Sequence, residues 1–176
     1  DIDSSSFFDP ITIIGDSIAV TGLNSNGNDV SLTADSGAIT DGSGDASTDL
    51  TAVLATATLA ATTGIDLDTD VSFINLTNTS GTVDITENDG FDVTGASLGS
   101  STTTLNTPNI DFSGSASGTG ALSIIPTTAA TTIGLGGGTG TPNIGDTDLG
   151  NLSDGFSSIT LGDPASADAV IATATL

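Results

Sequence analysis

The chain has 176 residues, 22 of them Asp or Glu, and contains no Lys, Arg, His, Cys, Met, Trp or Tyr. The net charge of −22 excludes nucleic acid and anionic membranes as partners, because affinity for phosphate comes chiefly from Lys and Arg. Soluble cations must neutralise the carboxylates, since no side chain here can form a salt bridge with them. We expect partners that are neutral, cationic or copies of the chain itself.

The composition also indicates a folded protein outside the cell. A hydrophobic fraction of 36% is too high for a disordered chain and predicts one folded core. Without Lys or Arg the chain offers no cleavage site to trypsin-like proteases, and without Cys it has no disulfide. Because the chain begins DIDSSSFFDP, without Met or a basic leader, we expect a mature or excised piece of a secreted precursor. We predict a secreted, extracellular or cell-surface location.

In chain order, the sequence predicts strands throughout and no sustained helix. An N-terminal segment, residues 1–29, contains the apolar run PITIIGDSIAV and forms an entry or junction to the main domain. Residues 30–176 carry further runs of strand length and β-branched composition. These runs are DVSLTA, VLATATL, GIDLDTDVSFINL, GTVDITE, FDVTGASL, NIDFSG, ALSII, TTIGLG, SSITLG and AVIATATL. Turns with a positive glycine φ are expected at Asn26-Gly27, Asp41-Gly42, Asp89-Gly90 and Asp154-Gly155.

The strands recur at a loose spacing of about 20 residues, which is typical of repeat folds. This spacing predicts an all-β, parallel β-solenoid (β-helix) of about eight or nine turns stacked about 4.8 Å apart. An antiparallel β-sandwich is the alternative fold. The residues expected to point inward are Leu32, Ile39, Leu54, Leu67, Phe73, Val83, Ile85, Val93, Leu105, Phe112, Leu122, Ile124, Ile133, Leu135, Ile159 and Leu161.

Two groups of Asp are candidate sites for a hard cation such as Ca²⁺, which binds carboxylate and carbonyl oxygens. Asp66, Asp68 and Asp70 alternate in IDLDTDV, so on a strand they would face one side about 7 Å apart. Asp146 and Asp148 lie at the end of the Gly-rich stretch GGGTGTPNIGDTD, and Asp154 lies in the turn after it. In both groups the alternative is structural: a solvated outer face for the first and a turn region for the second.

The inventory of catalytic groups is nearly empty. Without His, Cys, Lys or Tyr, only carboxylates and hydroxyls remain for acid–base or nucleophilic chemistry. Paired carboxylates can hydrolyse glycosides, but such sites also use cationic and aromatic groups to hold the sugar. We therefore expect no enzymatic activity and no cofactor other than Ca²⁺.

The stretches GALSIIPTTAATTIGLGGG and DLGNLSDGFSSITLGD, within a module at residues 120–163, resemble a known family. They are similar to a module of very large secreted β-strand-repeat proteins of bacteria, including cyanobacteria, which are related to filamentous haemagglutinin. The resemblance covers about residues 30–176 and implies a right-handed parallel β-helix with a role in adhesion, matrices or fibres. Where the family often continues with Arg after this module, this sequence has Asp163.

The sequence ends in the apolar run AVIATATL, without a turn, a Pro or a charge, and begins with the apolar run FFDPITII, which predicts self-assembly. The expected junction joins the segment 7–14 to the terminal strand 169–176. Its contact residues would be Phe7, Phe8, Ile11, Ile13, Val170, Ile171 and Leu176. We therefore expect a structural subunit that polymerises head to tail into an extracellular filament or matrix fibre, through solenoid ends or strand exchange. The alternative is a rod segment of a giant adhesin that binds glycans or another cell.

Overall fold

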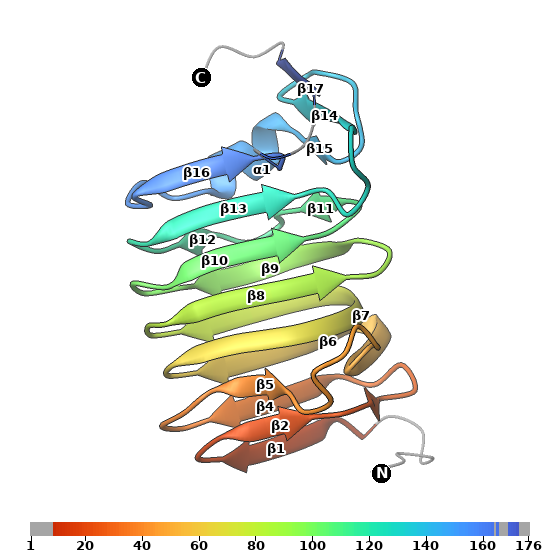
Figure 1. The fold of residues 1–176 in the computed structure, drawn as a ribbon, viewed down its shortest axis with the longest axis vertical. Coiled ribbons are helices and arrows are strands. Elements are labelled where there is room, and N and C mark those ends of the chain that lie inside the picture. Colours follow the sequence, from red (N-terminus) through yellow and green to blue (C-terminus); the bar gives the residue numbers. More distant parts are fainter. Residues whose placement is uncertain (1–8, 164, 166–168, 173–176) are drawn as a thin grey trace.

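The computed structural model describes residues 9–163, 165 and 169–172, the last group as backbone alone. It is a β-solenoid of about six turns and is nearly all β, with 53% strand and 4% helix among the residues described. Every strand pairing among the described residues is parallel, which excludes the antiparallel β-sandwich. The stack rises from the N-terminal end to the C-terminal end (Figure 1).

One long face of the solenoid, here called the first face, lies nearest the viewer in Figure 1. Neighbouring strands on it belong to successive turns and are hydrogen-bonded in register. Its strands are β2 (Ile18–Val20), β5 (Ile39–Asp41), the first part of β7 (Gly64–Asn78), β8 (Thr82–Glu87), β10 (Thr102–Asn106), β13 (Ala121–Ile125) and β16 (Ser158–Leu161).

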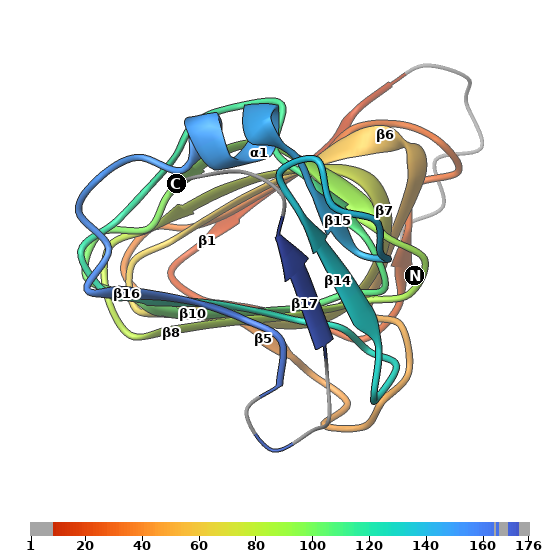
Figure 2. The same cartoon turned by 90° about the horizontal axis from the view of Figure 1, so that it is seen from above.

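The second face lies behind the first and is formed by the strands that follow in each turn (Figure 2). Its strands are β1 (Ile11–Gly15), β4 (Val30–Ala34), the last part of β6 (Leu50–Ala61), the last part of β7, β9 (Phe91–Ser97), β11 (Ile110–Asp111) and β12 (Ala116–Ser117). A short third face is formed by β3 (Leu23–Asn24), the start of β6 and the middle of β7, which pair with one another on successive turns.

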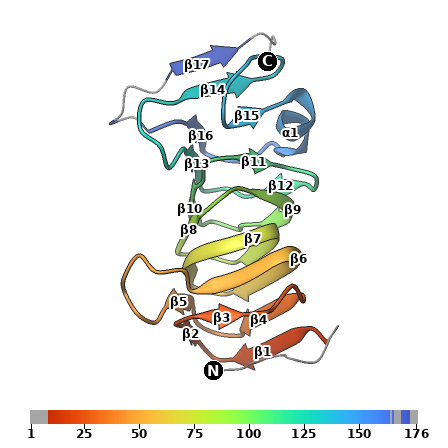
Figure 3. The same ribbon diagram turned by 90° about the vertical axis from the view of Figure 1, so that its right-hand side faces the viewer.

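The solenoid is right-handed, as the family resemblance implies. Strands of the first face run from left to right in Figure 1, and those of the second face return behind them while the chain climbs. At the C-terminal end the chain forms a second parallel sheet, in the order β15, β14, β17 (Figure 3). Its strands are β14 (Thr132–Leu135), β15 (Asn143–Ile144) and β17 (Ala169–Ala172). The helix α1 (Asp146–Asn151) follows β15 in the sequence.

The core follows from the alternation of apolar and polar residues. In β4, Val30, Leu32 and Ala34 are buried, whereas Ser31 and Thr33 between them face outward. The register between turns places inward side chains in columns: Leu32, for example, pairs with Leu59 on the next turn. Each buried Leu, Ile or Val contributes about 1.5–3 kcal/mol relative to an exposed one.

The prediction of eight or nine turns was wrong because two turns are enlarged by insertions. Most turns take 17–21 residues, as between Ile11 and its partner Val30. Ile39 pairs with Ile65, 26 residues later, because a loop at residues 42–48 is inserted. Leu122 pairs with Ile159, 37 residues later, because residues 126–151 form β14, β15 and α1 before the chain rejoins the stack at Leu152, which pairs with Ala116. These excursions use residues that would otherwise build further turns.

Most residues expected in the core are buried, but three are exposed and a fourth is half-buried. Leu54 is 84% exposed, Phe73 39% and Ile159 44%, and Leu161 is only half-buried. Leu54 lies in a bulge of β6, where the register against β7 shifts between Ala52 and Thr56. Between these two pairs β6 has two more residues than β7, and the alternation is interrupted: Ala52 and Ala55 are buried, whereas Val53 and Leu54 between them are exposed.

Three of the four predicted glycine turns are confirmed. Gly27, Gly90 and Gly155 have φ of 83°, 109° and 134°, which only glycine adopts without strain. Gly42 is the exception, since its φ is not positive. A side chain at Gly42 would instead meet Thr21, so that this glycine is required by close packing between neighbouring turns.

Candidate functional site

The Asp residues of IDLDTDV lie on β7 where it turns the corner from the first face to the third face. Asp66, Asp68 and Asp70 alternate with buried Leu67 and Thr69, as expected. The corner rotates successive outward positions away from one another, so the three carboxylates do not form one group. Asp68 joins Asp41 and Asp49, Asp70 joins two other acidic residues, and Asp66 belongs to neither cluster.

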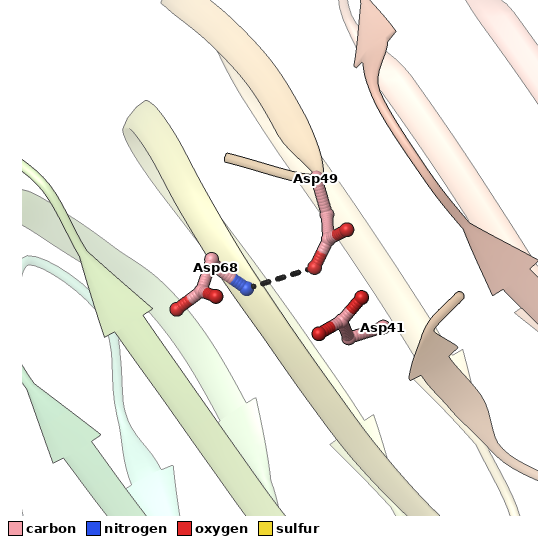
Figure 4. Close-up of side chains that lie close together, drawn as sticks. All are labelled: Asp41, Asp49 and Asp68. Atoms are coloured by element: carbon pink, nitrogen blue, oxygen red, sulfur yellow. Dashed lines mark hydrogen bonds between the residues drawn. The ribbon is translucent and has the colours of Figure 1, made fainter. Parts of the chain in front are cut away.

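The first acidic cluster consists of Asp41, Asp49 and Asp68, whose nearest carboxylate oxygens lie within 4.8 Å of one another (Figure 4). Asp41 ends β5, and the inserted loop at 42–48 then returns the chain to Asp49 just before β6. The backbone N–H of Asp68 donates to Asp49 Oδ2 at 3.2 Å. The backbone N–H groups of Ser43 and Gly44 both donate to Asp41 Oδ1 at 2.7 Å, which fixes this carboxylate in place.

The three carboxyl groups of this cluster differ in acidity. Burial raises the pKa of Asp49, which is 1% exposed, to about 6. Burial and the nearby charge of Asp41 also raise the pKa of Asp68. Hydrogen bonds from Gly44 and Ser43 lower the pKa of Asp41, so that this group stays ionised. A cation would therefore meet at least one fixed negative charge here, and below about pH 6 it would have to displace a proton from Asp49.

The second acidic cluster consists of Asp70, Glu87 and Asp89, again with oxygens within 4.8 Å. Glu87 is 1% exposed and accepts hydrogen bonds from Thr69 Oγ1 at 2.6 Å and from the backbone N–H of Val71 at 3.2 Å. Burial raises its pKa to about 7 in spite of these donors. Glu87 is thus the carboxyl group whose charge changes nearest neutral pH.

A shallow hollow of about 280 Å³ opens beside Glu87. Asp68, Thr69, Thr86 and Glu87 contribute to its lining, so it touches one residue of each cluster. Ca²⁺ binds oxygens at about 2.3–2.6 Å, and oxygens within 4.8 Å of one another can therefore share one ion. The geometry of these oxygens suits a hard cation.

The second predicted group, Asp146, Asp148 and Asp154, belongs to neither acidic cluster of the described residues. Asp148 has a structural role in α1: its Oδ2 accepts the N–H of Gly145 at 2.8 Å, which closes the start of the helix. Its Oδ1 accepts the N–H of Phe112 at 2.8 Å and ties the helix to the solenoid. Both carboxylate oxygens are therefore engaged within the protein.

Sequence reasoning missed Asp41, Asp49, Glu87 and Asp89. Asp41 and Asp89 were interpreted only as parts of Asp-Gly turns. A signal was present in the spacing, because Asp49 and Glu87 each lie 19 residues from Asp68, which is close to one turn of the repeat. Acidic residues one turn apart stack on neighbouring strands, so a search for repeated carboxylates would have found the corner.

The expected assembly residues are only partly described. Ile11 is buried in β1 and Ile13 is half-buried against the core. Val170 and Ile171 lie in β17, which pairs with β14 of the same chain in the register Ile133 to Val170. Phe7, Phe8 and Leu176 lie outside the described residues. Among the strands that are described, β1 and β16 end the order of the long sheet, and β15 and β17 end that of the short sheet.

Comparison with known proteins adds no relative to this picture. No family model, no curated protein and no solved structure matches the chain. Within the described residues, no helix has the length and apolar character needed to cross a membrane.

Proposed function

We propose that the chain is a structural subunit of an extracellular filament or matrix fibre, in which copies stack head to tail through their solenoid ends. The observation that supports this most strongly is the N-terminal turn. There β1, β2 and β3 each pair with a strand of the following turn and, among residues 9–163, with no strand on their other side. The role is structural and not enzymatic.

The unpaired edge of β1 can be assigned to particular backbone groups. The N–H of Ile11 and the carbonyl of Gly15 both bond to residues flanking β4. In a parallel strand the intervening residues direct their backbone groups to the opposite edge, so Thr12 and Ile14 present a free donor and acceptor there. A row of such groups is a template for another strand.

The apolar interior is also open at this end. A shallow hollow of about 180 Å³ lies at the N-terminal turn. It is lined by Ile13, Ile18, Ala19, Val20, Thr21, Gly22 and Leu23. A strand or turn stacked on it would cover apolar side chains and satisfy the edge of β1 together. Because the opposite end of the protein differs, the contact is heterologous and continues into a filament instead of closing.

The negative charge of the chain requires cations to take part in the proposed assembly. Two copies each carry a net charge of −22 and have no positive side chain with which to offset it. Divalent cations such as Ca²⁺, held by the two acidic clusters at the corner of β7, would reduce this repulsion between stacked copies. Assembly is therefore expected to depend on divalent cations.

The test is electron microscopy of the purified protein in physiological salt, with millimolar Ca²⁺ or with a chelator. We expect filaments with Ca²⁺ and shorter or no filaments with the chelator. Thr12→Pro removes one edge N–H and should prevent assembly, whereas the matched Thr12→Val keeps this N–H and should assemble normally. Monomeric rods under both conditions would contradict the proposal, as would normal filaments of Thr12→Pro.

The second candidate is a rod segment of a giant cell-surface adhesin that binds glycans or another cell. The same free edge of β1 favours it, because another turn of one long polypeptide would pair there as well as a separate copy. Isolated chains would then remain monodisperse rods with and without Ca²⁺. The microscopy above therefore separates the two candidates.

A further inference from the structure

The outer surface carries an apolar patch that the core does not explain. Val53 and Leu54 on β6 are 41% and 84% exposed, and Phe73 on β7 is 39% exposed. Leu54 and Phe73 were both expected to point inward. Departures from the hydrophobic pattern concentrate at functional or strained sites, so this patch is a place to look for a ligand.

The backbone holds the patch in place. Leu54 has a φ of 64°, in the left-handed region that costs a residue with a side chain about 1 kcal/mol or more. Its N–H donates to Ser72 Oγ on the neighbouring turn at 2.7 Å. Ser72 and Phe73 in turn border a hollow in the outer surface. The exposed leucine thus lies beside this hollow and is fixed to its rim.

The hollow combines an aromatic ring with carboxylates. It has a volume of about 370 Å³, and Phe73, Asp89, Asp92 and Asp111 contribute to its lining. Phe73 pairs in register with Asp92, and Asp92 with Asp111, so these side chains form a column about 4.8 Å apart on successive turns. Burial and the charges of Asp148 and Asp92 raise the pKa of Asp111, as expected where carboxylates crowd one another.

We propose that this surface binds a Lys- or Arg-bearing segment of a different protein. Such side chains join an apolar stem to a cationic head, and the surface places Leu54 and Phe73 beside three carboxylates. The ring of Phe73 also attracts a cation placed over its face. A second copy cannot supply the ligand, because the chain has no Lys, Arg or His. The inference does not depend on filament formation.

The proposal is tested by the binding of a short labelled peptide with two Lys to the full chain, in 150 mM salt with millimolar Ca²⁺. The matched peptide carries Gln in place of both Lys. We expect the Lys peptide alone to bind, and Phe73→Ser and Leu54→Gly to weaken it each by about fivefold without changing the protein's charge. Leu54→Gly relieves a strained position, so the loss cannot be ascribed to unfolding.

Two double variants of equal charge distinguish binding at the hollow from diffuse attraction between a cationic peptide and an acidic protein. Asp92→Asn with Asp111→Asn changes the hollow, and Asp66→Asn with Asp84→Asn changes the first face. We expect the first pair to weaken binding at least about tenfold and the second less than about twofold. Equal losses from both pairs would overturn the proposal. Equal binding of the Gln peptide, or displacement of the Lys peptide by a neutral oligosaccharide, would overturn it as well.

Discussion

The two ends of the solenoid are built from the same repeat but differ in how far other parts of the chain cover them. At the N-terminal turn, Ile13 and Leu23 are only half-buried and β1 has a free edge within the described residues. At the C-terminal end the insertion 126–151 packs on the last turns, where Ile144 is fully buried and Leu135 nearly so. The insertion therefore covers part of the C-terminal end, whereas β16, where Ile159 is 44% exposed, remains the last strand of its face.

The largest difference between the ends is expected from truncating one isoleucine at each. Ile144→Ala removes a fully buried side chain and should lower the free energy of unfolding by about 2–5 kcal/mol. Ile13→Ala at the open end should cost about 1 kcal/mol, because this side chain is already partly in water. Urea unfolding of the unassembled chains in chelator measures both. Equal losses would mean that the N-terminal end is as closed as the other.

Glu87 lies between the two ends, and the pH dependence of the free energy of unfolding measures how much its buried charge lowers stability. Its pKa is raised from 4.5 to about 7, so the folded protein holds this proton more tightly than the unfolded chain. Stability from this group is therefore present below pH 4.5 and lost as the pH rises to about 7, in total about 3 kcal/mol.

The matched variant Glu87→Gln keeps the shape and cannot ionise. Its stability relative to the wild type should rise by about 3 kcal/mol between pH 4 and pH 8, measured by urea unfolding in chelator. Asp89→Asn, which changes the exposed member of the same cluster, serves as the control and should show a much smaller change. Parallel curves for Glu87→Gln and the wild type would contradict the assigned burial.

A smaller effect is expected at the joint between the insertion and the solenoid. Asp148→Ala removes the acceptors of the Gly145 and Phe112 N–H groups and should cost about 1–2 kcal/mol. Asp146→Ala, also in the first turn of α1, is the matched control and should cost less than about 0.5 kcal/mol. Hydrogen exchange should show faster opening of α1 with no change in β1. Faster exchange in β1 as well would mean that the two ends are coupled.

The smallest effect is expected at the bulge of β6. Leu54→Gly removes a left-handed leucine that buries little of its side chain, and should leave stability unchanged or raise it by up to about 1 kcal/mol. Thermal unfolding measures the shift. A clear loss of stability would show that Leu54 packs against the solenoid and would weaken its assignment to a binding surface.

The sequence predicted the regular part of this molecule well and its irregular parts poorly. Alternation in stretches such as VSLTA fixes which residues point inward, and the spacing of about 20 residues predicts stacked parallel turns. A bulge at Leu54 leaves no trace in that alternation, because it depends on pairing with a neighbouring turn. For the same reason the pattern of strands alone did not reveal that residues 126–151 form an insertion between two turns.

The acidic corner shows a second limit. The alternation of Asp66, Asp68 and Asp70 was identified correctly, but their grouping depends on a corner of β7 and on which residues the adjacent turns bring alongside. The inserted loop at 42–48 places Asp41 next to Asp49, and this contact cannot be deduced from local spacing. Long-range pairing, and not local pattern, determines the composition of the site.

The most direct test of the proposed assembly is hydrogen exchange of the Thr12 and Ile14 amides, compared between the unassembled chain in chelator and the protein assembled with Ca²⁺. The account predicts rapid exchange of both amides in the unassembled chain, because they face the free edge of β1. It predicts strong protection after assembly. Filaments in which these two amides still exchange as fast as in the single chain would contradict the claim that the open end is the contact.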